Sequence, residues 1–103
     1  MNYTIYQIRS LEDIAYAFVG WEFASNHEFN LNDYSEVYSG SIQDGDPYIL
    51  LESLFAKFNA SRPRDFEGHS LSVSDVVKFS SNDDKDHFYY CDRFGWQDIT
   101  LFM

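Results

Sequence analysis

The residues whose types could do chemistry lie close together in Gly-His-Ser-Leu-Ser-Val-Ser-Asp, from Gly68 to Asp75. A histidine, hydroxyls and a carboxylate make up a catalytic triad, but a triad is recognised by geometry and not by closeness along the chain. The sequence also lacks the Gly-x-Ser-x-Gly turn that exposes a nucleophilic serine in many hydrolases. We therefore expect no enzymatic activity. Instead, the serines and Asp75 are expected to hydrogen-bond the backbone at a tight entry into a strand, and Gly68 to allow an unusual backbone angle.

No metal or cofactor site is predicted. The histidines His27, His69 and His87 are far apart without zinc-ligand spacing, and the single Cys91 excludes a multi-cysteine site. Cys91 is expected to be a small apolar strand residue. The run Asp83 to Asp86 lacks the spacing of a calcium loop, so a solvated hairpin turn is favoured over weak calcium binding.

The net charge is the most unusual property of the chain. Seventeen acids against seven bases give a formal charge of −10 and a pI near 4.4. This charge repels phosphate backbones, so direct nucleic-acid binding is not expected, whereas a basic protein surface would be attracted. Acidity that serves solubility alone is the alternative. The acids to which we assign partner binding are Asp44, Asp46, Asp83, Asp84 and Asp86.

Aromatic residues make up 19% of the chain, which gives a 103-residue domain ample material for a core. An exposed Tyr48, Trp21 or Trp96 beside the acids would form a binding hot spot, although core placement is the alternative for each. The composition predicts one domain over residues 1–103. Neither a signal peptide nor a membrane span is recognisable, so a cytoplasmic location is expected.

The hydropathy pattern predicts strands at 3–9, around 36–40, at 76–79 and at 87–92, the last two joined as a hairpin by the polar turn 80–86. The alternation in 14–18 favours a second strand, with a helix through residue 24 as its rival. A short helix is expected over about 21–28 and the main helix over about 47–59, with Asp46 as N-cap and Pro47 first. Residues 99–103 are expected to dock on the body of the protein.

The main helix is expected to bury one apolar face, composed of Ile49, Leu50, Leu54, Phe55 and Phe58. Together these elements predict an α+β fold: an antiparallel sheet of four to five strands packed against the main helix and the shorter one.

Three stretches resemble the YodL-like domain family: residues 58–77 with Gly-His-Ser-Leu-Ser-Val-Ser-Asp-Val-Val, residues 89–96, and residues 34–40. Such domains occur in Firmicutes, often within large polyvalent proteins of phages and conjugative elements. The resemblance implies no catalytic residues. It implies a fold-determining motif of Gly68, His69, Ser70, Ser72, Ser74, Asp75, Asp92 and Gly95.

An acidic, free-standing member of such a family suggests an inhibitor of host defence. We expect a non-enzymatic anti-CRISPR or anti-restriction protein whose carboxylates occupy the basic channel in which a nuclease holds nucleic acid. The alternative is a bacterial regulatory module that docks on a cytoskeletal or other cytosolic protein through apolar residues. Comparing charge-reversal with aromatic-to-alanine variants would distinguish the two.

Overall fold

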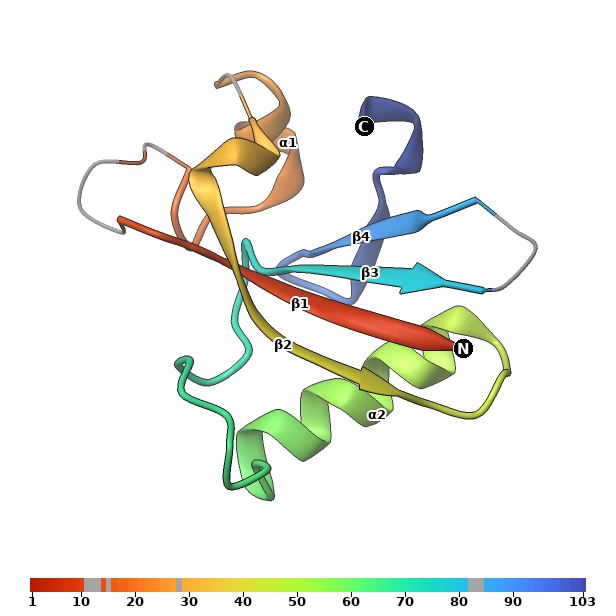
Figure 1. The fold of residues 1–103 in the computed structure, drawn as a ribbon. Helices are drawn as coiled ribbons and strands as arrows, with labels where there is room; N and C mark the ends of the chain where they lie inside the picture. Colours follow the sequence, from red (N-terminus) through yellow and green to blue (C-terminus); the bar gives the residue numbers. More distant parts are fainter. Residues whose placement is uncertain (11–13, 15, 28, 82–84) are drawn as a thin grey trace.

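One five-stranded antiparallel sheet forms the centre of the molecule, with the strand order β2-β1-β3-β4-β5 (Figure 1). The computed structural model describes residues 1–10, 14, 16–27, 29–81 and 85–103. The strands are β1 (Asn2–Ile8), β2 (Tyr34–Ser41), β3 (Val76–Ser80), β4 (His87–Cys91) and β5 (Trp96–Asp98). The expected α+β class is confirmed.

The first strand of the chain lies inside the sheet, between β2 and β3. Every residue of β1 from 3 to 8 is buried, because both faces of the sheet are covered. The side chains alternate between two clusters: Tyr3 and Ile5 join the cluster under α2, whereas Tyr6 and Ile8 join the cluster under α1. The alternation predicted for 3–9 therefore places side chains in two hydrophobic clusters, one on each face of the sheet.

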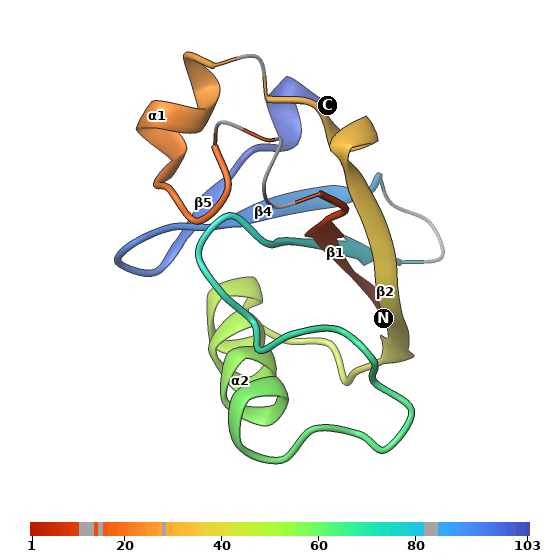
Figure 2. The ribbon, with the colours of Figure 1, turned by 90° about the vertical axis from the view of Figure 1, so that its left-hand side faces the viewer.

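The helix α2 (Pro47–Ala60) covers one face of the sheet, as Figure 2 shows. Its N-cap is Asp46, whose Oδ1 accepts hydrogen bonds from the backbone N–H groups of Tyr48 (2.9 Å) and Ile49 (3.4 Å). Pro47 occupies the first helical position, where no N–H is needed. The predicted helix and its cap are thus confirmed, with the end one residue later.

The buried stripe of α2 is formed by Leu51, Leu54 and Phe58, which follow at i, i+3 and i+7. The prediction that Ile49 lies on the buried face is wrong, since its side chain is 67% exposed. Two residues turn a helix by about 200°, so burying Leu51 places Ile49 on the outer side.

The opposite face is covered by residues 16–27 and 29–34 and by the C-terminal segment (Figure 1). This layer holds α1 (Trp21–Ser25) and a 3-10 helix, Leu31–Asp33. The short helix expected over 21–28 is present and ends earlier. Trp21, Tyr34 and Tyr90 form the aromatic centre of this second cluster.

The expected second strand in 14–18 is wrong. Tyr16, Ala17 and Phe18 form a turn, and Phe18 has a positive φ of 61°. Tyr16 is buried in the second cluster and its hydroxyl donates to Asp33 Oδ2 at 2.7 Å, so a tertiary contact decides the local structure. The rival helix is also wrong for these residues, since α1 begins only at Trp21.

The hairpin β3–β4 is confirmed, with Phe79 opposite His87. The short strand β5, which follows a turn closed by Gly95, was not predicted. Docking of the C-terminus is only partly right: Ile99 is fully buried and the Phe102 ring lies 5.2 Å from the Trp21 ring, but Leu101 is 98% exposed.

Candidate functional site

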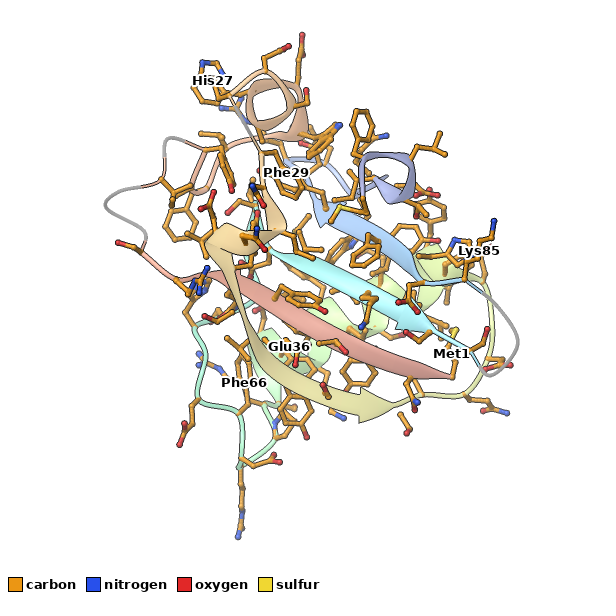
Figure 3. The ribbon with its side chains drawn as sticks, turned by 45° about the horizontal axis from the view of Figure 1, so that its top comes forward. Met1, His27, Phe29, Glu36, Phe66 and Lys85 are labelled. Carbon is orange, nitrogen blue, oxygen red and sulfur yellow. The ribbon has the colours of Figure 1, made fainter. Side chains whose placement is uncertain are left out.

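Exposed carboxylates gather at the end of the sheet where the chain begins. Asn2 pairs with both Ser41 and Ser80, so the loop after β2 and the turn after β3 lie beside the N-terminus. Figure 3 shows Met1 and Lys85 at this end, far from His27. The structure brings together Asp44, Asp46 and Asp86 of the predicted partner-binding acids, whereas Asp83 and Asp84 lie outside the described residues.

Each of these three acids also has a structural contact. Asp44 is 79% exposed, and its Oδ1 lies 3.1 Å from the ammonium group of Met1. Asp46 caps α2, and Asp86 Oδ1 accepts a hydrogen bond from Ser80 Oγ at 2.8 Å. All three side chains remain exposed, so these contacts orient the carboxylates without removing them from water.

A fourth acid at this end, Asp98, was missed by the sequence reasoning because β5 was not predicted. Asp98 pairs with Tyr89 across β4 and β5. Burial raises the pKa of Tyr89, and the nearby charges of Asp98 and Asp46 raise it further. We call the exposed acids Asp44, Asp46, Asp86 and Asp98 the acidic end.

Of the aromatics considered for a hot spot, only Tyr48 lies exposed at the acidic end. Tyr48 is 47% exposed and packs edge-on against Tyr89, with ring centroids 5.6 Å apart. The exposed Ile49 follows it. Trp21 is 8% exposed and belongs to the core, and Trp96 is partly buried against the first cluster.

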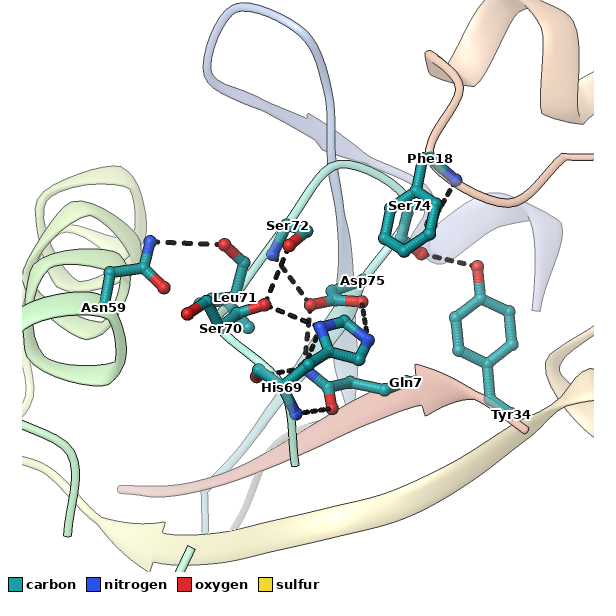
Figure 4. Close-up of polar contacts among 10 residues, drawn as sticks. All are labelled: Gln7, Phe18, Tyr34, Asn59, His69, Ser70, Leu71, Ser72, Ser74 and Asp75. Carbon is teal, nitrogen blue, oxygen red and sulfur yellow. Dashed lines mark hydrogen bonds and ion pairs between the residues drawn. The ribbon is translucent and has the colours of Figure 1, made fainter. Parts of the chain in front are cut away.

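The motif from Gly68 to Asp75 folds around one side chain of β1, Gln7 (Figure 4). Gln7 Oε1 accepts from the backbone N–H of His69 at 3.2 Å. Its Nε2 donates to the His69 carbonyl at 2.9 Å and to Asp75 Oδ2 at 3.0 Å. Gln7 is 3% exposed, and its position in an alternating strand gave no signal of this role.

Gly68 is needed for close approach and not for an unusual backbone angle. A Cβ at this position would lie 2.4 Å from Gln7 Oε1 and 2.8 Å from the Phe66 ring. Its φ lies outside the positive region, so the expectation about the angle is wrong; Gly95 has the positive φ, at 80°.

Asp75 is a buried carboxyl, 1% exposed, with two donors on one oxygen. Its Oδ2 accepts from Gln7 Nε2 and from the Ser72 backbone N–H at 2.8 Å. Burial raises its pKa to about 7, against the lowering effect of these donors. His69 Nε2 lies 4.0 Å from Asp75 Oδ1 and has no hydrogen-bond partner among the residues that the structure describes.

No serine of the motif directs its hydroxyl at the imidazole of His69. Ser72 Oγ donates to the Ser70 carbonyl, and Ser74 Oγ accepts from the Phe18 backbone N–H. Ser70 Oγ accepts from the Arg62 guanidinium, at 2.9 Å. The geometry of a catalytic triad is therefore absent among these residues.

The later motif residues hold the segment that enters α1. Asp92 Oδ1 accepts from the backbone N–H groups of Trp21 (3.2 Å) and Arg93 (2.8 Å). The Asp92 N–H donates to the Gly95 carbonyl at 2.9 Å and closes the turn between β4 and β5. Asp92 and Ser74 thus fix residues 18–21 over the second cluster.

A family model described as the YodL-like domain matches residues 2–102. The chain belongs to the YodL-like domain family. The match spans all five strands and both α-helices, so the polar motif and the acidic end are parts of one YodL-like domain. No curated protein and no solved structure matches the chain.

Within the described part of this YodL-like domain, no three metal-binding side chains cluster, and no helix is long and apolar enough to cross a bilayer. Cys91 is 3% exposed, and burial raises the pKa of its thiol to about 12. The thiol therefore stays protonated at neutral pH.

Proposed function

We propose that this YodL-like protein is a non-enzymatic inhibitor from a mobile genetic element, which binds a basic CRISPR or restriction nuclease in the host cytoplasm. The acidic end would occupy the channel in which the nuclease holds nucleic acid. The observation that carries the proposal is the gathering of exposed carboxylates from the loop before α2, the β3–β4 turn and β5 at one end of a chain of charge −10. Carboxylates there would stand in for phosphates.

The surroundings of the acidic end support binding to protein. Tyr48 and Ile49 present exposed apolar surface beside Asp46, and aromatic side chains next to charges are typical hot spots. Lys85 also lies near this end, so the local field is less negative than the count of acids suggests.

The alternative function is a regulatory module that docks on a cytoskeletal or other cytosolic host protein through apolar residues. The observation that favours it is the exposed apolar surface outside the acidic end, above all Phe94 (97% exposed) in the turn between β4 and β5. Charge would contribute little to such an interface, so binding would persist in high salt.

The test uses two triple variants of equal charge. Asp44→Asn/Asp86→Asn/Asp98→Asn neutralises three of the four acids of the acidic end and keeps Asp46, which caps α2. Asparagine oxygens retain the hydrogen bonds from Ser80 and Thr100. The matched control neutralises three exposed acids elsewhere, Glu36→Gln/Asp65→Asn/Glu67→Gln. Both variants change the formal charge from −10 to −7.

Wild-type protein should be captured with a nuclease from host lysate and should block DNA cleavage by that purified nuclease at low salt. The acidic-end variant should lose inhibition at least tenfold, and the control less than threefold. An equal loss of inhibition in both variants would mean that inhibition depends on the total charge of the protein and not on the position of the acidic end. A salt-resistant, non-nuclease partner would favour the regulatory module instead.

A further inference from the structure

A second surface lies away from the acidic end, between α1 and the turn that joins β4 to β5 (Figure 2, left). A cavity of about 640 Å³ opens here. Cavities of this size hold a small ligand or one to two large side chains. Its apolar wall is formed by Val19, Phe23 and Phe94.

The two phenylalanines on this wall are exposed to very different degrees, but neither belongs to a core. Phe94 is 97% exposed, so it contributes almost nothing to folding. Phe23 is 43% exposed, and its ring is held by stacking on the His27 ring, with centroids 3.7 Å apart. The stacked Phe23 ring therefore gives the cavity one apolar surface that is already positioned for an occupant.

The charged groups around the cavity indicate the chemistry of its occupant. Glu22 and Asp92 supply carboxylates, and the Glu22 carboxylate makes no hydrogen bond or ion pair within the described residues. Arg93 supplies a guanidinium that can donate to peptide carbonyls. A second copy of this chain would bring another −10 charge to the surface, which opposes self-association.

We propose that this cavity binds a peptide segment of a partner protein, in which a large apolar side chain is flanked by lysine or arginine. The apolar side chain inserts between Phe23 and Phe94. The flanking cation pairs with Glu22 and Asp92, and Arg93 donates to the backbone of the segment. This surface is separate from the acidic end, so the proposal does not rest on the function proposed above.

The test selects random 12-residue peptides displayed on phage against the wild-type protein, with counter-selection against Phe94→Ala. The retained peptides should carry a large apolar residue with lysine or arginine close by. Synthetic copies of these peptides should bind Phe94→Ala about tenfold more weakly than wild type. The alanine removes the aromatic ring that contacts the inserted apolar side chain, and a central aromatic often supplies much of the binding energy. Since Phe94 is exposed, this variant should fold normally, which its circular dichroism spectrum checks.

Leu101→Ala is the matched control, because it removes a similarly exposed apolar side chain outside the cavity. It should leave peptide binding within twofold of wild type, as should the triple asparagine variant of the acidic end. Peptides that are acidic or lack an apolar residue would overturn the proposal, as would equal binding to Phe94→Ala and wild type. Sedimentation that shows a dimer lost in Phe94→Ala would overturn it in favour of a second copy.

Discussion

Phe18 and Ser74 are the two non-glycine residues with positive φ among the described residues, and a hydrogen bond joins them. Their φ angles are 61° and 83°, and the Phe18 N–H donates to Ser74 Oγ at 3.0 Å. Ser74 is 1% exposed, and its carbonyl accepts from the Tyr34 hydroxyl at 2.6 Å. The strained turn before α1 and the strained entry into β3 therefore hold each other in place.

Replacing Ser74 by alanine should lower the free energy of unfolding by about 1–3 kcal/mol, because the Phe18 N–H loses its partner. Ser74→Gly removes the same hydroxyl but relieves the positive φ, so it should cost about 1 kcal/mol less. Urea unfolding of both variants measures the difference. If glycine destabilised the protein more than alanine, backbone strain at this position would be unimportant.

Gly68→Ala should destabilise the fold by about 1–3 kcal/mol, because the new methyl group would overlap Gln7 Oε1 and the Phe66 ring. Gly45→Ala is the control, since its Cβ would meet only Leu50, at an ordinary 3.7 Å. Thermal unfolding should leave the control within about 0.5 kcal/mol of wild type. Similar losses of unfolding free energy in the two variants would mean that Gln7 and Phe66 shift to make room for the new methyl group.

Asp75 should make stability fall as pH rises. Its pKa is about 7 in the fold, against an ordinary value of 3.8, so between these values the folded state binds more protons than the unfolded state. Its contribution is fully present below about pH 4 and is lost as pH rises through 7, by roughly 4 kcal/mol at most. Asp75→Asn keeps an oxygen to accept from Gln7 and Ser72, and it should flatten this dependence.

Urea unfolding at pH 4.5 and pH 8 checks this expectation. Wild type should lose more stability between the two pH values than Asp75→Asn does. The exposed Asp86→Asn, which changes the charge equally, should follow the wild type. Parallel pH dependence in wild type and Asp75→Asn would contradict the expectation, because the Asp75 carboxyl would then make no contribution to the change of stability with pH.

The carboxylate of Asp46, which caps α2, should stabilise the fold. Asp46→Ala leaves the N–H groups of Tyr48 and Ile49 without their acceptor and should cost about 1 kcal/mol of unfolding free energy. Asp46→Asn should cost much less, since asparagine caps helices as well as aspartate does. Chemical denaturation compares them; equal losses would mean that charge at the helix N-terminus matters more than the hydrogen bonds.

Regular elements with local signals were predictable from the sequence. Asp46 and Pro47 mark the start of α2, and alternation marks β1 and the β3–β4 hairpin. The turn at Tyr16 was not predictable, because its alternating pattern is locally that of a strand and a distant partner, Asp33, decides otherwise. Tertiary contacts override local preference in this way where a buried side chain is held by residues that are distant in the sequence.

Much of the candidate site depends on long-range pairing. Gln7 meets Asp75 across 68 positions, and nothing at residue 7 distinguishes it from any polar strand residue. Asp44 and Asp86 lie at one end because Asn2 pairs with both Ser41 and Ser80. Sequence supplies the acids, but only the strand order determines that they gather.

The position of β1 inside the sheet has a consequence for synthesis on the ribosome. β1 is translated first, yet its neighbour β3 begins only at Val76. Until that strand is made, one edge of β1 stays open, with Tyr3 and Ile5 beside it, and open apolar edges recruit other chains. Such late pairing also slows folding. A nascent chain that stalls after α2 should therefore aggregate, because its first strand still lacks β3, one of its two neighbours.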